Sequence, residues 1–360
     1  TAEYVTMESG TGCVHIAPGH GLDDYLTGIE YGFDIYCPLS DSGCYVDDGM
    51  IPQELVGVSV LEKSTGCPAN SEVLRILEST SSLLAKQSHH HQYPHCWRSK
   101  TPVIFRAMDQ WFVALDEKEL RNRSISAVDD VSFTPDWGRK RIRGFLESRP
   151  DWCISRQRSW GVPIPVFYNE EGEPLLNTEL INFLANRIAK EGTDAWFSLS
   201  EEELLNGFEL PEDWKGKALT KGTDTLDVWI DSGCSHRSVL KTLDGLEWPA
   251  DLYLEGSDQH RGWFHSSLLE SCGTRGRAPF ESILSHGFVV DGKGLKMSKS
   301  LGNVIAPEDI LKKYGADILR IWVASSNYAE DLRIDHSILD QHADSYRKIR
   351  NTFRYLLGNL

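Results

Sequence analysis

The eight cysteines of this 360-residue chain include no Cys-x-x-Cys pair, so the short ligand spacing of zinc sites and redox dithiols is absent. Scattered cysteines in a chain of this length do not form a disulfide scaffold, and they indicate reduced thiols. No run approaches the roughly 18 apolar residues that a transmembrane helix needs. The sequence therefore predicts neither a disulfide-rich secreted domain nor a membrane segment.

The start of the chain lacks both an initiating Met and a signal-peptide pattern. We therefore expect a chain cut from something longer, or a processed one. Basic residues are also scarce, since 37 Lys and Arg face 53 Asp and Glu and give a net charge of −16. Polyanion-binding proteins are usually basic. Local basic clusters, at 139–143, 156–158 and 293–299, still allow a basic groove.

Strand and helix patterns alternate over 222–330, which predicts a parallel α/β sheet. A more acidic stretch at about 165–220 is interpreted as an insertion. After Asp335, apolar residues spaced by three and four predict a helix that packs on a bundle. The expected helices are 71–86, 139–147, 178–191, 258–272 and helices within 307–325, and the expected strands are 101–105, 251–255 and 283–290.

The most specific motif is the string from Lys296 to Ser300, which follows a glycine-containing turn. Two lysines three residues apart on a loop are compact charges suited to phosphates. Such charges matter most when negative charge builds on phosphates during displacement. A lone Lys-x-x-Lys is usually a solvated turn, but the full string followed by Leu301, Gly302 and Asn303 is far more specific.

The string 296–300 resembles the second signature of class I aminoacyl-tRNA synthetases. Three further segments resemble the isoleucyl enzymes, and they keep that family's order over nearly the whole chain: 151–165, 225–233 and 253–264. The resemblance implies ligation of isoleucine to tRNA through an isoleucyl-adenylate, with ATP and Mg2+ as substrate. It also implies a Rossmann-like catalytic domain.

The resemblance assigns roles at the synthetic site. Glu255, where a strand meets a helix start, is expected to contact the adenylate and to hold the substrate ammonium, and Gln259 follows one helical turn later. Lys299 is expected to bind ATP, with Lys296 beside it. Trp229 and Trp263 are interpreted as apolar walls, with core packing as the alternative. Asp227 and Asp231 either bind substrate or cap local structure, and we leave them outside the site.

A second, hydrolytic site is also implied. One methylene separates isoleucine from valine, a difference known for these enzymes to be worth only about 1–3 kcal/mol. The segment 10–25 resembles part of the editing site that removes mischarged valine. By that resemblance Asp24 holds the ammonium, and His15 shapes the pocket or orients water. Cys13, His15 and His20 have poor spacing for a metal, and we interpret His20 as structural.

The chain departs from the family in three places. The first class I signature, His-x-Gly-His, is missing, as is the threonine-rich half of the editing pocket. Ser99 stands where some relatives have the second cysteine of a Cys-x-x-Cys pair with Cys96. Because hydroxyls are poor zinc ligands, we expect no zinc in this segment. The chain alone is expected to be inactive.

The expected fold class is α/β, with part of a β-rich editing domain before the catalytic domain and the start of an α-helical bundle after it. The expected domains are 1–92, 93–330 and 331–360. The expected partners are tRNA(Ile), isoleucine and ATP, and we expect a cytoplasmic monomer that binds no membrane. The alternatives are a non-catalytic tRNA-binding paralogue, against which the intact lysine string argues, and a valyl or leucyl enzyme, against which Trp229 and the 258–264 string argue.

Overall fold

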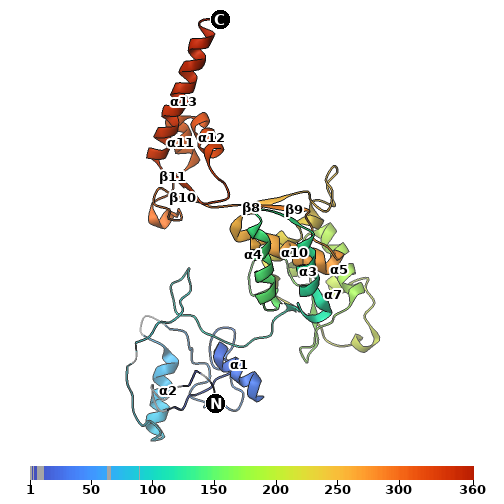
Figure 1. Cartoon of the computed structure of the whole chain (residues 1–360). Coiled ribbons are helices and arrows are strands. Elements are labelled where there is room, and N and C mark those ends of the chain that lie inside the picture. Colours follow the sequence, from blue (N-terminus) through green and yellow to red (C-terminus); the bar gives the residue numbers. More distant parts are fainter. Residues whose placement is uncertain (1, 3, 6–11, 63–65, 89) are drawn as a thin grey trace. The chain divides into compact units, whose positions relative to one another are not determined.

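The chain forms two compact units, Thr1–Asp109 and Gln110–Leu360. The computed structural model describes residues 2, 4–5, 12–62, 66–88 and 90–360 (Figure 1). The first unit contains α1 (Leu22–Tyr31) and α2 (Pro68–Ser79). Gly32 ends α1 with a φ of 68°, a left-handed conformation that glycine adopts without steric cost. The expected domain boundaries at 92 and 330 stay predictions.

Helix α2 lies earlier than the expected 71–86. Pro68 occupies its first turn, where the missing N–H costs nothing. The Thr80 hydroxyl donates to the Ile76 carbonyl, and Ser81 has a φ of 56°. These features end the helix, so Leu84 lies outside it and is 99% exposed.

Regular strands, which we expected in this unit, do not form among its described residues. The backbone instead pairs through isolated bridges, Leu39 with Tyr45, Cys44 with Ser59, and His95 with Pro102. The expected strand 101–105 is represented by the last of these bridges alone. Glycines and prolines interrupt each extended run before a ladder can continue. Hydrophobic side chains consequently stay exposed on α1, namely Leu22, Leu26 and Ile29.

A parallel three-stranded sheet organises the second unit, as the alternating pattern predicted. Its order is β2 (Ser132–Thr134), β9 (Ser282–His286) and β8 (Tyr253–Gly256), with β9 in the centre. Both Phe133 and Tyr253 stand opposite Ile283. The expected strand 283–290 is therefore two strands, β9 and β10 (Val289–Asp291), separated at Gly287, where a Cβ would lie 2.2 Å from the Glu330 carbonyl oxygen.

Three helices pack with this sheet around the main core: α3 (Leu120–Asp129), α4 (Trp137–Ser148) and α10 (Trp263–Arg275). Figure 1 shows them grouped beside β8 and β9. The expected helix 258–272 begins instead with a 3-10 turn, η3 (Ser257–His260), and α10 starts after Gly262. Helix α10 is buried along most of its length, so its residues position the candidate site.

Two short antiparallel strand pairs also belong to the second unit. Strand β1 (Phe112–Val113) pairs with β3 (Trp152–Cys153), and β4 (Ser155–Arg156) pairs with β7 (Thr225–Leu226), both antiparallel. The short helices α8 (Val228–Gly233) and α9 (Ser235–Ser238) follow β7, and η1 (Glu117–Glu119) precedes α3.

The acidic stretch that we interpreted as an insertion has a hydrophobic core of its own. Strands β5 (Phe167–Tyr168) and β6 (Thr220–Lys221) pair at its base. Helix α5 (Thr178–Glu191) has the expected bounds, with Asn177 as its cap and Gly192 after it. The remaining elements are α6 (Asp194–Ser198), α7 (Glu201–Leu205) and η2 (Glu212–Trp214). The core residues are Phe167, Leu175, Leu180, Leu184, Trp196 and Leu204.

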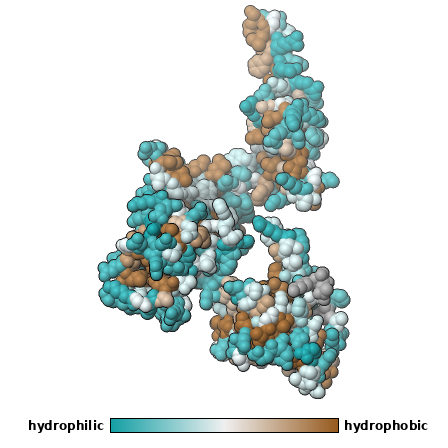
Figure 2. Space-filling view, turned by 180° about the vertical axis from the view of Figure 1, so that it is seen from behind, coloured by the Kyte–Doolittle hydropathy of each residue, from teal (hydrophilic) through white to brown (hydrophobic). Residues whose placement is uncertain are grey.

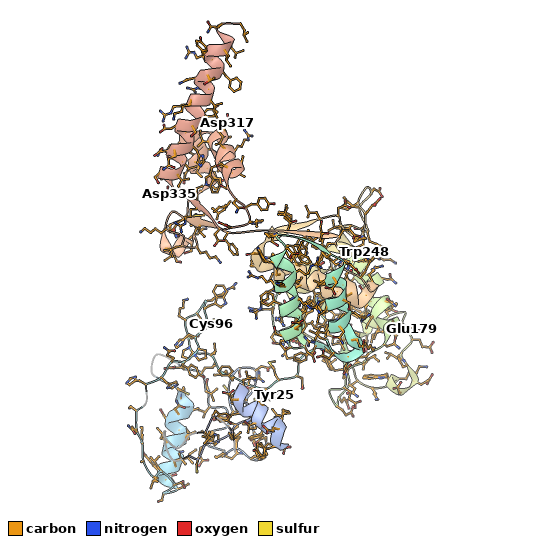
Figure 3. The ribbon with its side chains drawn as sticks, in the orientation of Figure 1. Tyr25, Cys96, Glu179, Trp248, Asp317 and Asp335 are labelled. Carbon is orange, nitrogen blue, oxygen red and sulfur yellow. The ribbon has the colours of Figure 1, made fainter. Side chains whose placement is uncertain are left out.

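The C-terminal part is helical around a third core. Strand β10 pairs in parallel with β11 (Leu332–Ile334), and η4 (Lys299–Leu301), α11 (Pro307–Tyr314), α12 (Ala316–Ser325) and α13 (His336–Leu357) complete it. The Asp335 carboxylate accepts from the Ile338 N–H at 2.8 Å and caps α13 (Figure 3). Figure 2 shows hydrophobic side chains at the end of α13, where Phe353, Tyr355 and Leu357 are more than half exposed.

Candidate functional site

Glu255 lies at the carboxyl end of β8, as the sequence predicted. It stands opposite Ser285 of β9, and Gly256 ends the strand opposite His286. Its side chain is exposed, and one carboxylate oxygen accepts from the Gly256 N–H at 3.2 Å. Because ligands of open parallel sheets bind beyond the carboxyl ends of the strands, this carboxylate is positioned to meet a cationic group.

The turn at Gly262 brings together three of the predicted site residues. A Cβ at this position would lie 2.4 Å from Oε1 of Gln259 and 3.0 Å from the ring of Trp229. The same Oε1 accepts from the Trp263 N–H at 2.8 Å and so caps α10. A side chain at Gly262 would displace Oε1 of Gln259 and so disturb the bond that caps α10. Gln259, Trp229 and Trp263 are therefore neighbours, although about 30 residues of sequence separate the tryptophans.

The two tryptophans have different environments. Trp263 is half-buried and stacks on the buried Tyr253, with ring centroids 4.1 Å apart. Its Nε1–H donates to the Ser232 carbonyl at 2.9 Å, which attaches α10 to α8. Trp229 is 41% exposed. Trp263 therefore packs against the core, whereas Trp229 presents an exposed apolar face.

The sequence left open whether Asp227 binds substrate or caps local structure. In the structure Asp227 caps α8. Its Oδ1 accepts from the Trp229 N–H at 3.2 Å. Its Oδ2 accepts from Nε1 of Trp152 at 3.0 Å and from the Arg156 guanidinium at 2.8 Å. The side chain is buried, so both oxygens are occupied by protein donors. Asp227 thus holds the Trp229 helix in place.

A buried carboxyl group also lies between α8 and α10. A Cβ at Gly233 would lie 2.1 Å from Oε1 of Glu270, an atom that is buried without a hydrogen-bond partner. Burial, and then the charge of Asp231, raise the pKa of Glu270 to about 8. Burial also raises the pKa of Asp231. Glu270 is consequently protonated at neutral pH, which lets α8 pack against α10.

The predicted lysine loop is exposed and is shaped by hydrogen bonds at its base. Asn303 accepts from the Ser298 N–H at 2.9 Å, and its amide donates to Asp291 at 2.9 Å. Met297 packs on the third core. Among the described residues neither Lys296 nor Lys299 forms an ion pair. The loop therefore presents two unneutralised ammonium groups.

The structure does not join the lysine loop to the rest of the predicted site. No hydrogen bond or ion pair in the described part of the chain connects it to Glu255, Gln259 or the two tryptophans. The reason lies in the chain path, because β9 leaves the sheet and enters a separate parallel pair, β10 with β11, before the loop begins. The lysine loop and the residues around Gly262 thus stand as separate groups of residues.

The predicted editing residues lie in the first unit. Asp24 is in the first turn of α1, and its Oδ2 accepts from the Ala17 N–H at 2.9 Å. His15 is exposed, and no hydrogen bond links it to Asp24. His20 is half-buried, with Nδ1 bonded to the Phe105 carbonyl at 2.9 Å, as expected for a structural histidine. Gly10 and Thr11 of this motif lie outside the described residues.

No described group of three or more His, Cys, Asp or Glu residues is arranged to hold a metal ion. Hydrogen bonding from Ser99 lowers the pKa of the half-buried Cys96 thiol to about 7, so the serine favours the thiolate form of Cys96. None of the helices in the described ranges has the length and apolar content needed to cross a membrane.

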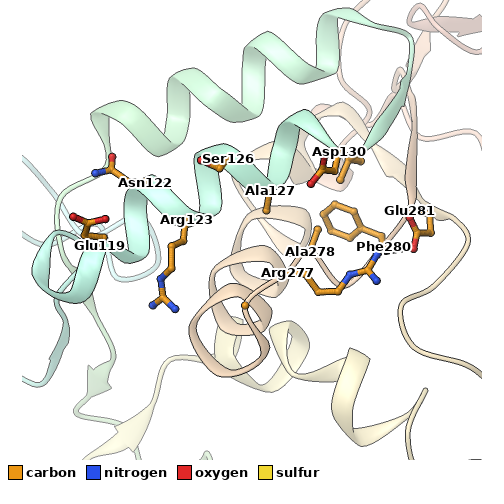
Figure 4. A pocket seen from close by; sticks show the side chains of 12 residues that line it. Glu119, Asn122, Arg123, Ser126, Ala127, Asp130, Arg277, Ala278, Phe280 and Glu281 are labelled. Carbon is orange, nitrogen blue, oxygen red and sulfur yellow. Dashed lines mark hydrogen bonds and ion pairs between the residues drawn. The ribbon is translucent and has the colours of Figure 1, made fainter.

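Three cavities of the second unit have linings that include none of Glu255, Gln259, Trp229, Trp263, Lys296 and Lys299. One of about 580 Å³ lies between the 156–162 segment and α8, beside the 90% exposed Trp160. Another, of about 380 Å³, lies between α3 and the turn after α10, and Figure 4 shows its lining, which includes none of the predicted site residues. A third, of about 420 Å³, is lined by Arg149, Arg261 and His265. Sequence reasoning missed these last three residues, although Arg261 lies inside a recognised string.

Comparison with known proteins places most of the chain in one family. Residues 23–335 match the family model described as tRNA synthetases class I (I, L, M and V). The chain is 56% identical over 360 residues to the isoleucine–tRNA ligase of Pelagibacter ubique, and 52% identical over 359 residues to that of Syntrophotalea carbinolica. These matches cover 100% and 99% of this chain but 38% of each relative, so the chain spans less than half the length of the curated relatives it matches.

Solved structures show more distant similarity. The methionyl-tRNA synthetase of Mycobacterium tuberculosis in complex with methionyl-adenylate is 19% identical, with a TM-score of 0.43 over 69% of this chain and 39% of that one. The LeuRS-tRNA-LeuAMS complex of Agrobacterium radiobacter is 21% identical, with a TM-score of 0.42 over 58% of this chain and 29% of that one. Because the family model matches most of its length, this chain belongs to the class I tRNA synthetases of the I, L, M and V group.

Proposed function

We propose that the chain is a central segment of an enzyme that ligates isoleucine to tRNA(Ile) with ATP, through an isoleucyl-adenylate. The observation that carries the proposal is the gathering of Gln259, Trp229 and Trp263 around Gly262, in the turn that follows Glu255 at the carboxyl end of β8. An apolar wall beside a carboxylate suits an aliphatic amino acid that carries an ammonium group. The 56% identity to an isoleucine–tRNA ligase supports the choice of amino acid.

In this proposal each residue acts by position and charge, and no protein nucleophile is needed. Glu255 holds the substrate ammonium, and the exposed face of Trp229 contacts the aliphatic side chain. Lys299 binds ATP, supplied with Mg2+, and Lys296 adds a second charge as the phosphates separate. Because the lysine loop is not joined to Glu255, the loop must close over ATP for both halves to act together.

We also propose a role for the first unit in hydrolytic editing of mischarged valine. Asp24 would hold the ammonium of the mischarged amino acid, and His15 would shape the pocket. The hydrogen bond from Ala17 fixes Oδ2 of Asp24, which leaves Oδ1 for a ligand. By the same resemblance we expect a cytoplasmic, monomeric enzyme, whose synthetic site needs more chain than these 360 residues.

The test is a chimaera in which this chain replaces the matching segment of the Pelagibacter ubique ligase. We expect isoleucine-dependent ATP–pyrophosphate exchange, and we expect Lys299→Gln to lower its rate by about 100-fold. Lys312→Gln, which changes an exposed lysine of α11, is the matched control. A folded chimaera without exchange, or one that activates leucine or methionine better than isoleucine, would refute the proposal. A non-catalytic paralogue would bind tRNA but show no exchange.

A further inference from the structure

The cavity of about 420 Å³ beside Asp227 is lined by basic side chains from several separate elements. Arg149 follows α4, Arg156 belongs to β4, and Arg261 stands between η3 and α10. His265, in the first turn of α10, also lines the cavity. Residues far apart in sequence thus converge on a single space.

His265 is a buried polar group that lacks a partner. Its side chain is 1% exposed, and both ring nitrogens are buried without a hydrogen bond. Burial, and then the charges of Arg149 and Arg261, lower its pKa to about 3. The ring is therefore neutral at pH 7 and keeps one N–H donor. A buried donor without an acceptor is unfavourable, so a ligand that accepts a hydrogen bond would relieve it.

Arg149 and Arg261 likewise have no counter-ion among the described residues. Nε of Arg149 is buried without a partner. Its guanidinium lies 5.1 Å from the ring of Trp152, and that of Arg261 lies 5.8 Å from the ring of Phe145. Burial lowers the pKa of Arg149, and the charge of Arg261 lowers it further, against the opposing effect of Asp227. Arginine stays charged in proteins, so two positive charges face the cavity.

The acidic residues at the cavity do not neutralise these charges directly. Both oxygens of Asp227 accept hydrogen bonds from Trp229, Trp152 and Arg156. Oδ1 of Asp151 accepts from the Leu115 N–H at 2.9 Å. Arg156 is the arginine whose charge is paired, by Asp227. Positive charge and unsatisfied donors therefore remain in the lining of the cavity.

We propose that this cavity binds a phosphate group, with Arg149, Arg261 and His265 as its donors. Guanidinium groups form paired hydrogen bonds with phosphate oxygens, and the neutral His265 ring adds a third donor. The phosphate belongs either to an RNA backbone or to a free phosphate ion. The proposal does not depend on isoleucine ligation, since it concerns binding alone.

The experiment measures binding of inorganic phosphate to the 360-residue chain by isothermal titration, in chloride buffers of matched ionic strength. We expect Arg149→Gln and Arg261→Gln each to weaken binding by at least about tenfold, and His265→Leu to weaken it less. Arg275→Gln, at the exposed end of α10, is the matched control and should leave binding unchanged. Circular dichroism checks the folding of each variant. If Arg149→Gln fails to fold, Arg261→Gln, which changes an exposed side chain, still tests the proposal.

A second arm identifies the source of the phosphate with a short labelled single-stranded RNA. Competition between RNA and inorganic phosphate, lost in Arg261→Gln, would assign the site to an RNA backbone. RNA binding that is unaffected by Arg261→Gln, while phosphate binding is lost, would assign it to a free phosphate ion. Phosphate binding that is absent, or equal in all variants, would overturn the proposal. None of these results depends on pyrophosphate exchange, so failure here is distinct from failure of the proposed function.

Discussion

At the scale of single residues, the buried carboxyl of Glu270 makes the stability of the second unit depend on pH. The pKa of Glu270 is raised from 4.5 to about 8, so the folded chain holds the proton more tightly than the unfolded chain does. The free energy of unfolding is therefore expected to decrease as the pH rises from about 4.5 to about 8. The physical cause is the burial of a charge between α8 and α10, near Asp231.

Glu270→Gln, which stays neutral, should remove this dependence. We expect the variant to match the wild type near pH 5 and to be more stable by roughly 2–4 kcal/mol at pH 9, after allowance for partial exposure. Urea unfolding at several pH values measures the difference. Glu281→Gln, which alters an exposed carboxylate paired with Arg277, is the control. A constant difference between wild type and Glu270→Gln at all pH values would contradict the prediction.

Asp227 is the residue whose loss should disturb the site most. Asp227→Ala removes the cap of α8 and leaves Trp152 and Arg156 without an acceptor. We expect a loss of about 2–4 kcal/mol in the free energy of unfolding and greater exposure of tryptophan to a soluble fluorescence quencher. Asp227→Asn keeps an oxygen for the cap and should lose less. Equal losses in the two variants would show that the capping bond is unimportant.

At the scale of elements, the cap of α13 is the clearest local determinant. The Asp335 carboxylate accepts from the Ile338 N–H and the Ser337 hydroxyl, and these bonds, the one from Ile338 most, lower the pKa of Asp335. Asp335→Ala should cost about 1 kcal/mol in thermal unfolding. The cost should shrink as the pH falls through the lowered pKa, because protonation weakens the acceptor in the wild type. Asp344→Ala, in the middle of α13, should cost less.

Elements were predictable where their signals are local. Helix α5 has the expected bounds because Asn177 caps it and Gly192 follows it, and Pro307 starts α11 as expected. Predictions failed where backbone geometry decides, as at Ser81, which ends α2 early, and at Gly287, which divides the expected strand 283–290. The extended segments of the first unit failed for another reason, since a strand needs a partner that periodicity does not identify.

At the scale of the whole molecule, the three hydrophobic cores formed by the described residues all belong to Gln110–Leu360. We therefore expect a chain of residues 110–360 to fold without the first unit. Its far-ultraviolet circular dichroism should show a folded, helical chain. Its tryptophan fluorescence should change cooperatively in urea. A non-cooperative change would show that the second unit depends on the first.

The sequence by itself determined the family resemblance, the parallel α/β pattern and most helices, because those signals lie in strings of neighbouring residues. It also predicted Glu255, Gln259, Trp229 and Trp263 as one group, and the turn at Gly262 brings the last three together. The roles of all these residues, and of Lys296, Lys299, His15 and Asp24, stay predictions.

Only the tertiary structure decided the rest. Asp227 is a cap because Trp152 and Arg156 meet it from about 70 residues away in sequence. Glu270 holds a proton because α8 covers it, and His265 faces Arg149 and Arg261 because α4, β4 and α10 converge on one cavity. Burial and the distances between charges set protonation and hydrogen bonding, and both depend on contacts between residues that the sequence keeps far apart.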